Sequence, residues 1–353
     1  MERLHMSSIR SVAIALGVAV MLSAPSASLA GPSGGGGGFV RADLDGDGDD
    51  DILLRNVVGG ELGYWLIQDG AIQFGGALIG IPSSFEIQAV GKINGDNIDD
   101  LVVRDSATGE VFAWLMTFNG GTNAVTIDTG TLVGDSAGFE VRSVGQFNPG
   151  TDGIPDLLLQ DPTTSTIAVW YLNADGSFQD GGAFGDPGTN WTVVSAADLE
   201  GNGVSDIVIR NLTAGEIGFW ETLDGSFSVN RGSGFGLPAT FNVLGASADF
   251  NDDTIDDIVL QDDAGNVSIW FMFSDGATAP TIDSSVSVGA AGASTVASPG
   301  LFNTDAFQDI LLVESVGGDI NIAAWFLNSG VFIGGGFVGA PPNAFEVSNI
   351  GTN

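Results

Sequence analysis

The chain has 353 residues, 44 acidic side chains against nine basic ones, a formal net charge of −35 and no cysteine. This acidic balance argues against nucleic acid or an anionic membrane surface as a partner, because both need a basic surface on the protein. The hydrophobic content of 44%, with 22 phenylalanines and seven tryptophans, is too high for a disordered acidic chain. A large folded core is therefore expected.

Residues 1–30 have the pattern of a secretory signal peptide. A basic start, "MERLHMSSIR", precedes the apolar run "SVAIALGVAVMLSA" and a small-residue end at Ala30. The apolar run is shorter than the ~20 residues that span a bilayer, so a membrane anchor is the weaker interpretation. We expect cleavage near Ala30, a flexible linker over residues 31–38, and a secreted, extracellular protein without a membrane span, with the periplasm and the cell surface as alternatives.

Cleavage would also limit the chemistry of the mature chain. His5, the only histidine, would leave with the signal peptide, and no cysteine is present. Nucleophilic catalysis by a serine–histidine or cysteine–histidine pair is then excluded, and so is zinc held by histidine. A pair of carboxylates is the simplest catalytic arrangement that the composition still permits.

After residue 39 an acidic segment recurs six times, at a spacing of 49 to 54 residues. The six segments, named loops one to six, begin at Asp43, Lys92, Gln146, Asp198, Asp249 and Leu301. One tryptophan per copy keeps the same phase: Trp65, Trp114, Trp170, Trp220, Trp270 and Trp325. Two markers that recur together indicate a repeat architecture.

Each copy is expected to contain four short strands. In the second copy "FEIQAV" alternates, "DLVV" is a brief apolar run, "GEVFAWLM" alternates around the tryptophan, and a glycine-rich segment follows. Four strands per ~50 residues are typical of propeller blades. The first copy lacks its opening strand, and the chain ends on a spare one, "FEVSNIG", from Phe345 to Gly351. We therefore predict an all-β, six-bladed propeller of antiparallel strands over residues 39–353, closed by the C-terminal strand, with seven blades as the alternative.

Loop one, "DLDGDGDDD", has the ligand spacing of a calcium loop. Its odd positions carry Asp43, Asp45, Asp47, Asp49 (through its carbonyl) and Asp51, and Gly48 permits the tight turn. Calcium prefers such a set of oxygen ligands. The alternative is a solvated turn in which aspartate and glycine are only good turn formers.

The other loops differ in how many ligands they retain. Loop four offers Asp198, Glu200, Asn202 and Asp206, and loop five offers Asp249, Asn251, Asp253 and Asp257. Calcium is expected in loops one, four and five. Loops two, three and six begin with Lys92, Gln146 and Leu301 and should bind weakly or not at all, and the Lys92 ammonium can occupy the cation position of loop two.

The loop, the short apolar strand and the tryptophan strand together resemble the FG-GAP/VCBS repeat family, whose blades also form the heads of integrin α-subunits. The resemblance covers residues ~40–353 and implies a binding, adhesive or accessory module with structural calcium. Integrin heads have seven blades, which is why that number is kept as the alternative.

We accordingly expect a secreted, monomeric, calcium-stabilised and non-catalytic binding or adhesion module for extracellular glycans or protein partners. An acidic structural or matrix protein is the alternative, followed by a carboxylate-based glycoside hydrolase. The six recurring tryptophans are interpreted as core residues between blades, as is Trp191, which stands where most copies have phenylalanine. Polar residues that end the second strand of several copies (Arg55, Arg104, Arg210, Gln160 and Gln261) are expected to bond carboxylates or carbonyls between blades.

Overall fold

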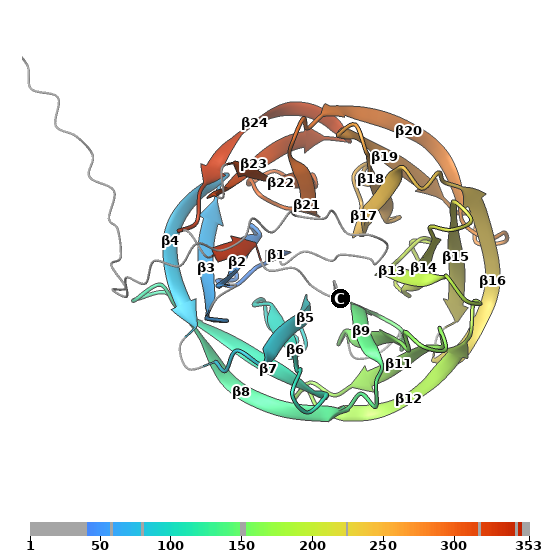
Figure 1. Cartoon of the computed structure of the whole chain (residues 1–353), viewed down its shortest axis with the longest axis horizontal. Coiled ribbons are helices and arrows are strands. Elements are labelled where there is room, and N and C mark those ends of the chain that lie inside the picture. The colour runs from blue at the N-terminus through green and yellow to red at the C-terminus, as the bar shows by residue number, and fades with distance from the viewer. Residues whose placement is uncertain are drawn as a thin grey trace, which may run out of the picture.

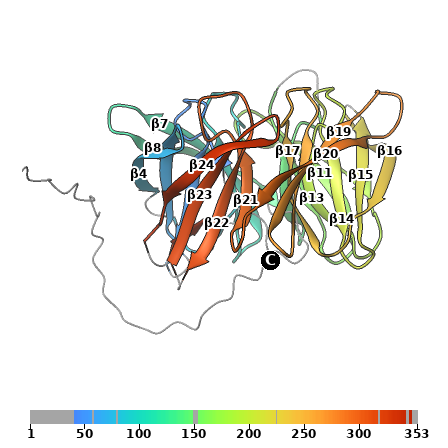
Figure 2. The same ribbon diagram turned by 90° about the horizontal axis from the view of Figure 1, so that it is seen from above.

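The computed structural model of the chain describes residues 41–56, 59–78, 81–148, 153–223, 225–316, 319–342 and the backbone of 345–347. The expected signal peptide and linker lie outside these residues. Six antiparallel sheets stand in a ring around a central axis, with one sheet per sequence repeat (Figure 1). Seen edge-on, the strands run between the two end faces of the ring, where the connecting loops lie (Figure 2). The prediction of an all-β, six-bladed propeller is confirmed, and the alternative of seven blades is wrong.

The blades are numbered in chain order. Blade 1 contains β1 (Arg41–Ala42), β2 (Asp51–Asn56), β3 (Leu62–Gln68), β4 (Ala71–Leu78) and β25 (Phe345–Val347). Blade 2 contains β5 (Phe85–Gly91), β6 (Asp100–Asp105), β7 (Glu110–Asn119) and β8 (Ala124–Asp135). Blade 3 contains β9 (Glu140–Gly145), β10 (Asp156–Gln160), β11 (Ile167–Leu172) and β12 (Phe178–Gly185).

The second half of the ring repeats this order. Blade 4 contains β13 (Thr192–Ala197), β14 (Asp206–Asn211), β15 (Glu216–Leu223) and β16 (Ser226–Gly236). Blade 5 contains β17 (Phe241–Ala248), β18 (Asp257–Asp262), β19 (Asn266–Phe273) and β20 (Thr281–Ala290). Blade 6 contains β21 (Thr295–Gly300), β22 (Asp309–Val316), β23 (Asp319–Asn328) and β24 (Val331–Gly339).

Blade 1 closes the ring with strands from both ends of the chain. The closing strand β25 pairs with β2, with Val347 opposite Leu54, as the spare C-terminal segment predicts. The inner position is shared, however, because β1 pairs with the first two residues of β2 and places Arg41 opposite Ile52. Blade 1 is therefore held by two separate segments, and the predicted end of the closing strand at Gly351 lies outside the described residues.

The second strand of each blade is a continuous apolar run because it is covered on both faces by neighbouring blades. Six clusters of buried side chains result, one at each interface between blades. At the interface of blades 6 and 1, for example, Ile52 and Ile67 meet Leu311 and Ala324. All six recurring tryptophans pack in these clusters, which confirms their predicted role between blades.

The glycine-rich outer strands are explained by these tryptophans. In five blades a glycine of the outer strand pairs with the tryptophan, and in blade 5 Ser285 takes its place opposite Trp270. A Cβ atom added at Gly75 would lie 3.1 Å from Cδ1 of Trp65, closer than ordinary contact. The indole thus lies across the outer strand, and a larger residue there would displace it.

The described part of the chain contains no helix with the length and hydropathy needed to cross a membrane.

Candidate functional site

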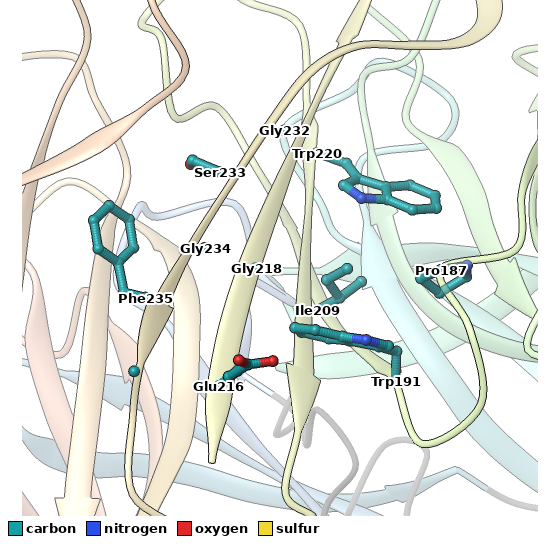
Figure 3. A pocket seen from close by; sticks show the side chains of 11 residues that line it. Pro187, Trp191, Ile209, Glu216, Gly218, Trp220, Gly232, Ser233, Gly234 and Phe235 are labelled. Atoms are coloured by element: carbon teal, nitrogen blue, oxygen red, sulfur yellow. The ribbon is translucent and has the colours of Figure 1, made fainter. Parts of the chain in front are cut away.

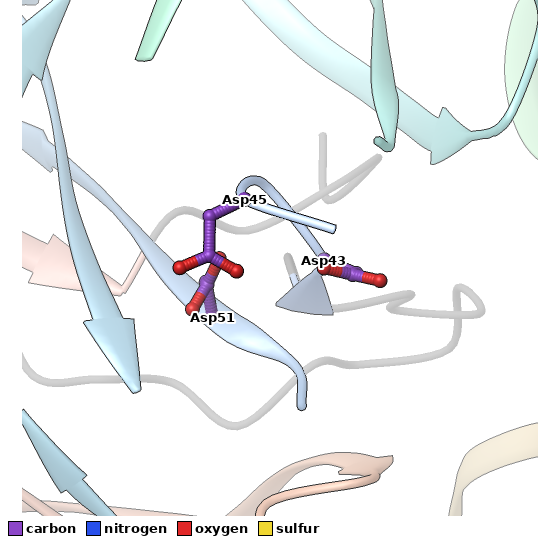
Figure 4. Close-up of side chains that lie close together, drawn as sticks. All are labelled: Asp43, Asp45 and Asp51. Atoms are coloured by element: carbon purple, nitrogen blue, oxygen red, sulfur yellow. The ribbon is translucent and has the colours of Figure 1, made fainter. Parts of the chain in front are cut away.

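Loop one joins β1 to β2 and brings three carboxylates together. Oxygen atoms of Asp43, Asp45 and Asp51 lie within 4.8 Å of one another (Figure 4). Among the described residues, no other set of three acidic side chains is gathered this closely. An all-oxygen, anionic donor set of this kind suits a hard divalent cation such as calcium.

The raised pKa values of two residues in the cluster also favour a bound cation. Burial raises the pKa of Asp51, whose side chain is fully buried, to about 9. Burial, followed by the charge of Asp47, raises the pKa of Asp45 to about 6. Without a counter-charge these groups resist ionisation, and a bound cation would favour their charged forms. The residues therefore fit a metal ion, which Asp43, Asp45 and Asp51 would hold.

The other two predicted ligands of loop one point elsewhere. Asp47 Oδ1 accepts the Asp49 N–H at 2.9 Å, within the turn. Asp49 is buried, and its Oδ2 accepts the N–H of Asp69 at 2.9 Å in the turn between β3 and β4. The carboxylates of Asp47 and Asp49 thus order the loop and are not part of the three-carboxylate cluster.

The side chain of Lys92, the first residue of loop two, pairs with a residue of loop one. Its Nζ lies 3.4 Å from Oδ2 of Asp43, so the ammonium of loop two reaches across to loop one of the neighbouring blade. The interpretation that Lys92 occupies the cation position of loop two is therefore wrong. Part of the acidic charge of loop one is instead balanced by blade 2.

The last aspartate of every loop has a structural task that the sequence interpretation missed. It is fully buried, and its two oxygens accept backbone N–H groups from the start of the loop and from the residue two positions after the tryptophan. Asp51, for example, accepts from Leu44 and Ile67, each at 2.8 Å. We call these residues the latch aspartates, and they are Asp51, Asp100, Asp156, Asp206, Asp257 and Asp309. Asp206 and Asp257, predicted as calcium ligands, make the same two backbone contacts as Asp51, but only Asp51 also lies in a cluster of three carboxylates among the described residues.

A second set of contacts joins neighbouring loops through pairs of reciprocal hydrogen bonds, which we call clasps. The N–H of Asp43 donates to Oδ2 of Asp99 at 2.8 Å, and the N–H of Asp99 donates back to the Asp43 carbonyl at 2.8 Å. The same reciprocal pair joins Gln146 to Ser205, Asp198 to Asp256, and Leu301 to Asp50. In each clasp, the first residue of one loop meets the residue just before the latch aspartate of the next blade.

In loop four the acidic ligands are drawn into the turn and toward an arginine. Both oxygens of Asp198 accept backbone N–H groups, from Asn202 and Gly203. Glu200 is paired with Arg231 at 3.0 Å, and Asn202 Nδ2 donates to Glu200 at 3.0 Å. A guanidinium therefore lies beside the residue predicted to hold a cation.

Loop five is likewise closed by its own hydrogen bonds. Asp249 Oδ1 accepts the N–H groups of Asn251 and Asp253, and its Oδ2 accepts that of Thr254 at 2.7 Å. Asn251 Nδ2 donates to Asp253 at 2.9 Å. The structure does not bring three carboxylates together in either loop four or loop five, so calcium there stays a prediction from sequence alone.

The structure also brings Glu221, which the sequence analysis did not single out, close to Glu200, a predicted ligand of loop four. Glu221, buried on β15, accepts from Arg231 Nη2 at 2.7 Å, and the same guanidinium pairs with Glu200. Burial raises the pKa of Glu200. The pKa of Glu221 is lowered because, against its burial, Arg231 and Asn230 donate hydrogen bonds to it. The two carboxylates are bridged by a cation, which leaves no substrate position between them.

The inner strands enclose a cavity of about 580 Å³ around the axis. Arg41, Lys92 and Arg142, which come from three sequence repeats, all line it. Each lies beside a carboxylate: Arg41 is 3.2 Å from Asp50, Lys92 pairs with Asp43, and Arg142 pairs with Glu140. Basic residues that are dispersed in the sequence thus converge at the axis, in a lining whose charges are locally paired.

Four of the five polar residues at the ends of the second strands, Arg55, Gln160, Arg210 and Gln261, bond backbone carbonyls as predicted, whereas Arg104 shows no such bond among the described residues. Arg210 donates to the carbonyls of Glu216 and Pro238 at 2.7 and 2.9 Å. Gln160 donates to the Trp191 carbonyl and accepts from the Val193 N–H, each at 2.9 Å, which ties blade 3 to blade 4. These contacts are structural. Trp191 itself packs against the cluster between blades 3 and 4, as expected of a core residue.

One repeat unit therefore consists of an acidic loop, a latch aspartate on a buried strand, a tryptophan strand and a glycine-rich edge. The FG-GAP-like repeat family matches residues 151–209, from loop three to strand β14. This segment of the chain is an FG-GAP-like repeat. The resemblance drawn from the loops and tryptophans is confirmed, and the other blades repeat the FG-GAP unit with the same latch.

Comparison with curated proteins gave no match to this chain. Two solved structures are similar in fold. A Bacteroides caccae protein of unknown function has 11% identity and a TM-score of 0.38, over 78% of this chain and 83% of that one. A candidate 6-phosphogluconolactonase from Bacteroides fragilis has 12% identity and a TM-score of 0.46, over 84% of each chain. At these values neither structure bears on the function of this protein.

Proposed function

We propose that this FG-GAP propeller is a secreted, monomeric, non-catalytic binding or adhesion module that calcium stabilises and that recognises extracellular glycans or protein partners. The observation that carries the proposal is the three-carboxylate cluster of Asp43, Asp45 and Asp51. Calcium bound there would supply positive charge to a buried acidic group. The FG-GAP fold supports the binding role.

The position of the cluster supports a structural role for the cation. Loop one is clasped to blade 2 through Asp99 and to blade 6 through Asp50, and β2 carries the closing strand β25. A cation in loop one would therefore tighten the place where the ring closes. At ten times its dissociation constant, calcium would stabilise the fold by about 1.4 kcal/mol per site.

The state of the acidic residues favours binding over hydrolysis. Glycoside hydrolases need two carboxylates that are free to act on a sugar between them. Outside loop one, Glu200 and Glu221 are the candidate pair, and both are bonded to Arg231. An acidic structural or matrix protein is the remaining alternative, and it would bind no defined ligand.

Melting of the full chain in calcium and in chelator tests the calcium role, and a glycan array tests the binding role. We expect a higher melting temperature in calcium and binding to a defined glycan or, failing that, to a protein partner. Equal melting in both buffers would reject calcium stabilisation. Specific binding with no turnover of the bound glycan would support the module over the hydrolase.

A further inference from the structure

A groove of about 340 Å³ opens on the perimeter of blade 4, beside blade 3 (Figure 3). Two half-buried indoles, Trp191 and Trp220, form its sides, and Ile209 lies between them on the floor. Glycines of β15 and β16 form much of the remaining surface. Its volume falls in the ~300–1,000 Å³ range of ligand pockets.

The groove exists because blade 4 lacks side chains that other blades place there. Two residues before its tryptophan, blade 4 pairs Gly218 with Gly234. The corresponding pairs are Gly63 with Ala77, Phe112 with Leu132, Ala168 with Ala183, Ser268 with Ser287, and Ala323 with Phe337. In blade 2 this space is aromatic, since Phe85 contacts both Phe112 and Trp114, with ring centroids 5.6 and 5.2 Å apart. Blade 4 has Trp191 and Trp220 at the positions of Phe85 and Trp114. At the position of Phe112, between them, it has Gly218.

The neighbouring blade also leaves the Trp220 ring open. At three other interfaces a glycine at the end of the preceding outer strand covers the tryptophan. A Cβ atom added at Gly339, Gly134 or Gly289 would lie 3.0 to 3.6 Å from the six-membered ring of the next blade's tryptophan. The corresponding Gly185 of blade 3 would meet no atom within 4 Å. Trp220 therefore lacks the contact with a neighbouring outer-strand glycine that Trp65, Trp170 and Trp325 have.

The polar groups around the groove complement the two indoles. Glu216, exposed at the start of β15, places its carboxylate beside Trp191 (Figure 3). Strand β16 is the outermost strand of its sheet, so one row of its peptide groups faces no further strand of the blade. The groove thus offers flat apolar faces together with hydrogen-bond acceptors and donors at its edge.

We infer that this groove binds a pyranose ring of a neutral or amino sugar, stacked on the indoles of Trp191 and Trp220 with its hydroxyls toward Glu216 and the edge of β16. A pyranose has an apolar C–H face, attracted by the negative face of an indole, and hydroxyls around its rim. A uronic acid would meet the Glu216 carboxylate in a protein of net charge −35. A phenylalanine side chain would offer that carboxylate no hydrogen-bond donor. The inference rests on the proposed binding function and names its ligand class.

The test is an array of neutral, amino and uronic-acid glycans probed with the full chain in calcium, followed by titration of the strongest binder. We expect neutral or amino glycans to bind. Trp191→Ala should weaken the affinity by about 30-fold or more, as removal of a central tryptophan does at binding hot spots. Gly236→Leu should have a similar effect, because its side chain would enter open space at the groove.

Two matched controls separate the groove from general damage. Gly336→Leu makes the same change on the outer strand of blade 6, where an added Cβ also meets open space. Trp65→Ala removes a tryptophan whose ring is covered by Gly339. Both should retain the affinity of the wild type, although Trp65→Ala should lower the melting temperature.

The inference is overturned if no glycan binds, if uronic acids or aromatic peptides are preferred, or if Trp191→Ala and Gly236→Leu bind as the wild type does. Melting in calcium and in chelator is recorded on the same samples. A calcium response without glycan binding would reject the groove and leave calcium stabilisation standing. Glycan binding without a calcium response would support the groove and reject calcium stabilisation.

Discussion

Replacement of a latch aspartate tests whether burial or hydrogen bonding controls its ionisation. Asp309 lies in loop six, where calcium is not expected. Its side chain is fully buried and accepts the N–H groups of Leu327 and Phe302 at 2.8 and 3.3 Å. Burial raises the pKa of Asp309 to about 7, although these hydrogen bonds oppose the shift. The folded state then binds more protons than the unfolded state between pH ~4 and ~7, so stability falls as pH rises through that range.

The magnitude follows from the shift. One group protonated only in the folded state changes the free energy of unfolding by about 1.4 kcal/mol per pH unit, or at most about 2.7 kcal/mol between pH 5 and 7. Partial ionisation and loop relaxation reduce this to about 1–3 kcal/mol. With an unfolding entropy of about 2.1 cal/mol/K per residue over the propeller, the melting temperature should change by about 2–4 °C.

The assay is calorimetric melting in chelator from pH 5 to pH 8. Asp309→Asn should resemble the protonated acid, so the variant should lose less stability than the wild type as pH rises. Asp305→Asn is the matched control, because it removes one charge from an exposed position of the same loop. Parallel pH profiles for the two variants, with Asp309→Asn less stable throughout, would refute the reasoning and show that the two N–H groups keep Asp309 ionised.

Three further changes have direct outcomes in thermal melting. Asp45→Asn should remove the contribution of loop one, about 2 °C at tenfold excess over the dissociation constant, from the calcium-induced rise in melting temperature. Asp253→Asn in loop five should retain that contribution, and equal responses of the two variants would argue against loop one as the main site. Ser205→Ala should cost about 1 kcal/mol in the free energy of unfolding by removing one of the two hydrogen bonds between Ser205 and Gln146, and a cost near zero would mean that this bond adds no stability. Gly75→Val should cost about 1–3 kcal/mol because its side chain would collide with Trp65, and a neutral result would contradict the account of the glycine-rich outer strands.

The periodic features of the sequence were sufficient for the fold. The spacing of loops and tryptophans gave six blades, and the spare segment at Phe345 gave the closing strand. The division of the inner strand between β1 and β25 could not be predicted, because a two-residue pairing such as Arg41 with Ile52 has no sequence pattern of its own.

The site was predicted less completely, because its contacts cross between blades. The pairing of Lys92 with Asp43 depends on how two neighbouring loops face each other. The latch could have been found from sequence, since loops three and six retain Asp156 and Asp309 while losing most other acidic positions. Because these two loops have lost most of the other calcium ligands, metal binding does not explain why Asp156 and Asp309 are present.

The groove also left a signal that was not used. Residues 232–236 read "GSGFG", with glycine at alternate positions, so one face of this end of β16 carries no side chains. Beside Trp191, the tryptophan outside the regular phase, this pattern indicates a bare strip of sheet next to an aromatic ring. Its depth could not be predicted, because it depends on Gly185 of the neighbouring blade.

The chain of clasps is interrupted at two seams on opposite sides of the ring. Between blades 2 and 3 the clasp position is Pro155, which has no N–H, and between blades 5 and 6 it is Gln308, whose buried Oε1 has no hydrogen-bond partner among the described residues. The propeller is thereby divided into two arcs of three blades, 6–1–2 and 3–4–5, each clasped throughout. The first arc contains the acidic cluster and the ring closure, and the second contains the tryptophan groove. Calcium and sugar would therefore act on separate arcs, and each should bind with an affinity that is independent of the other.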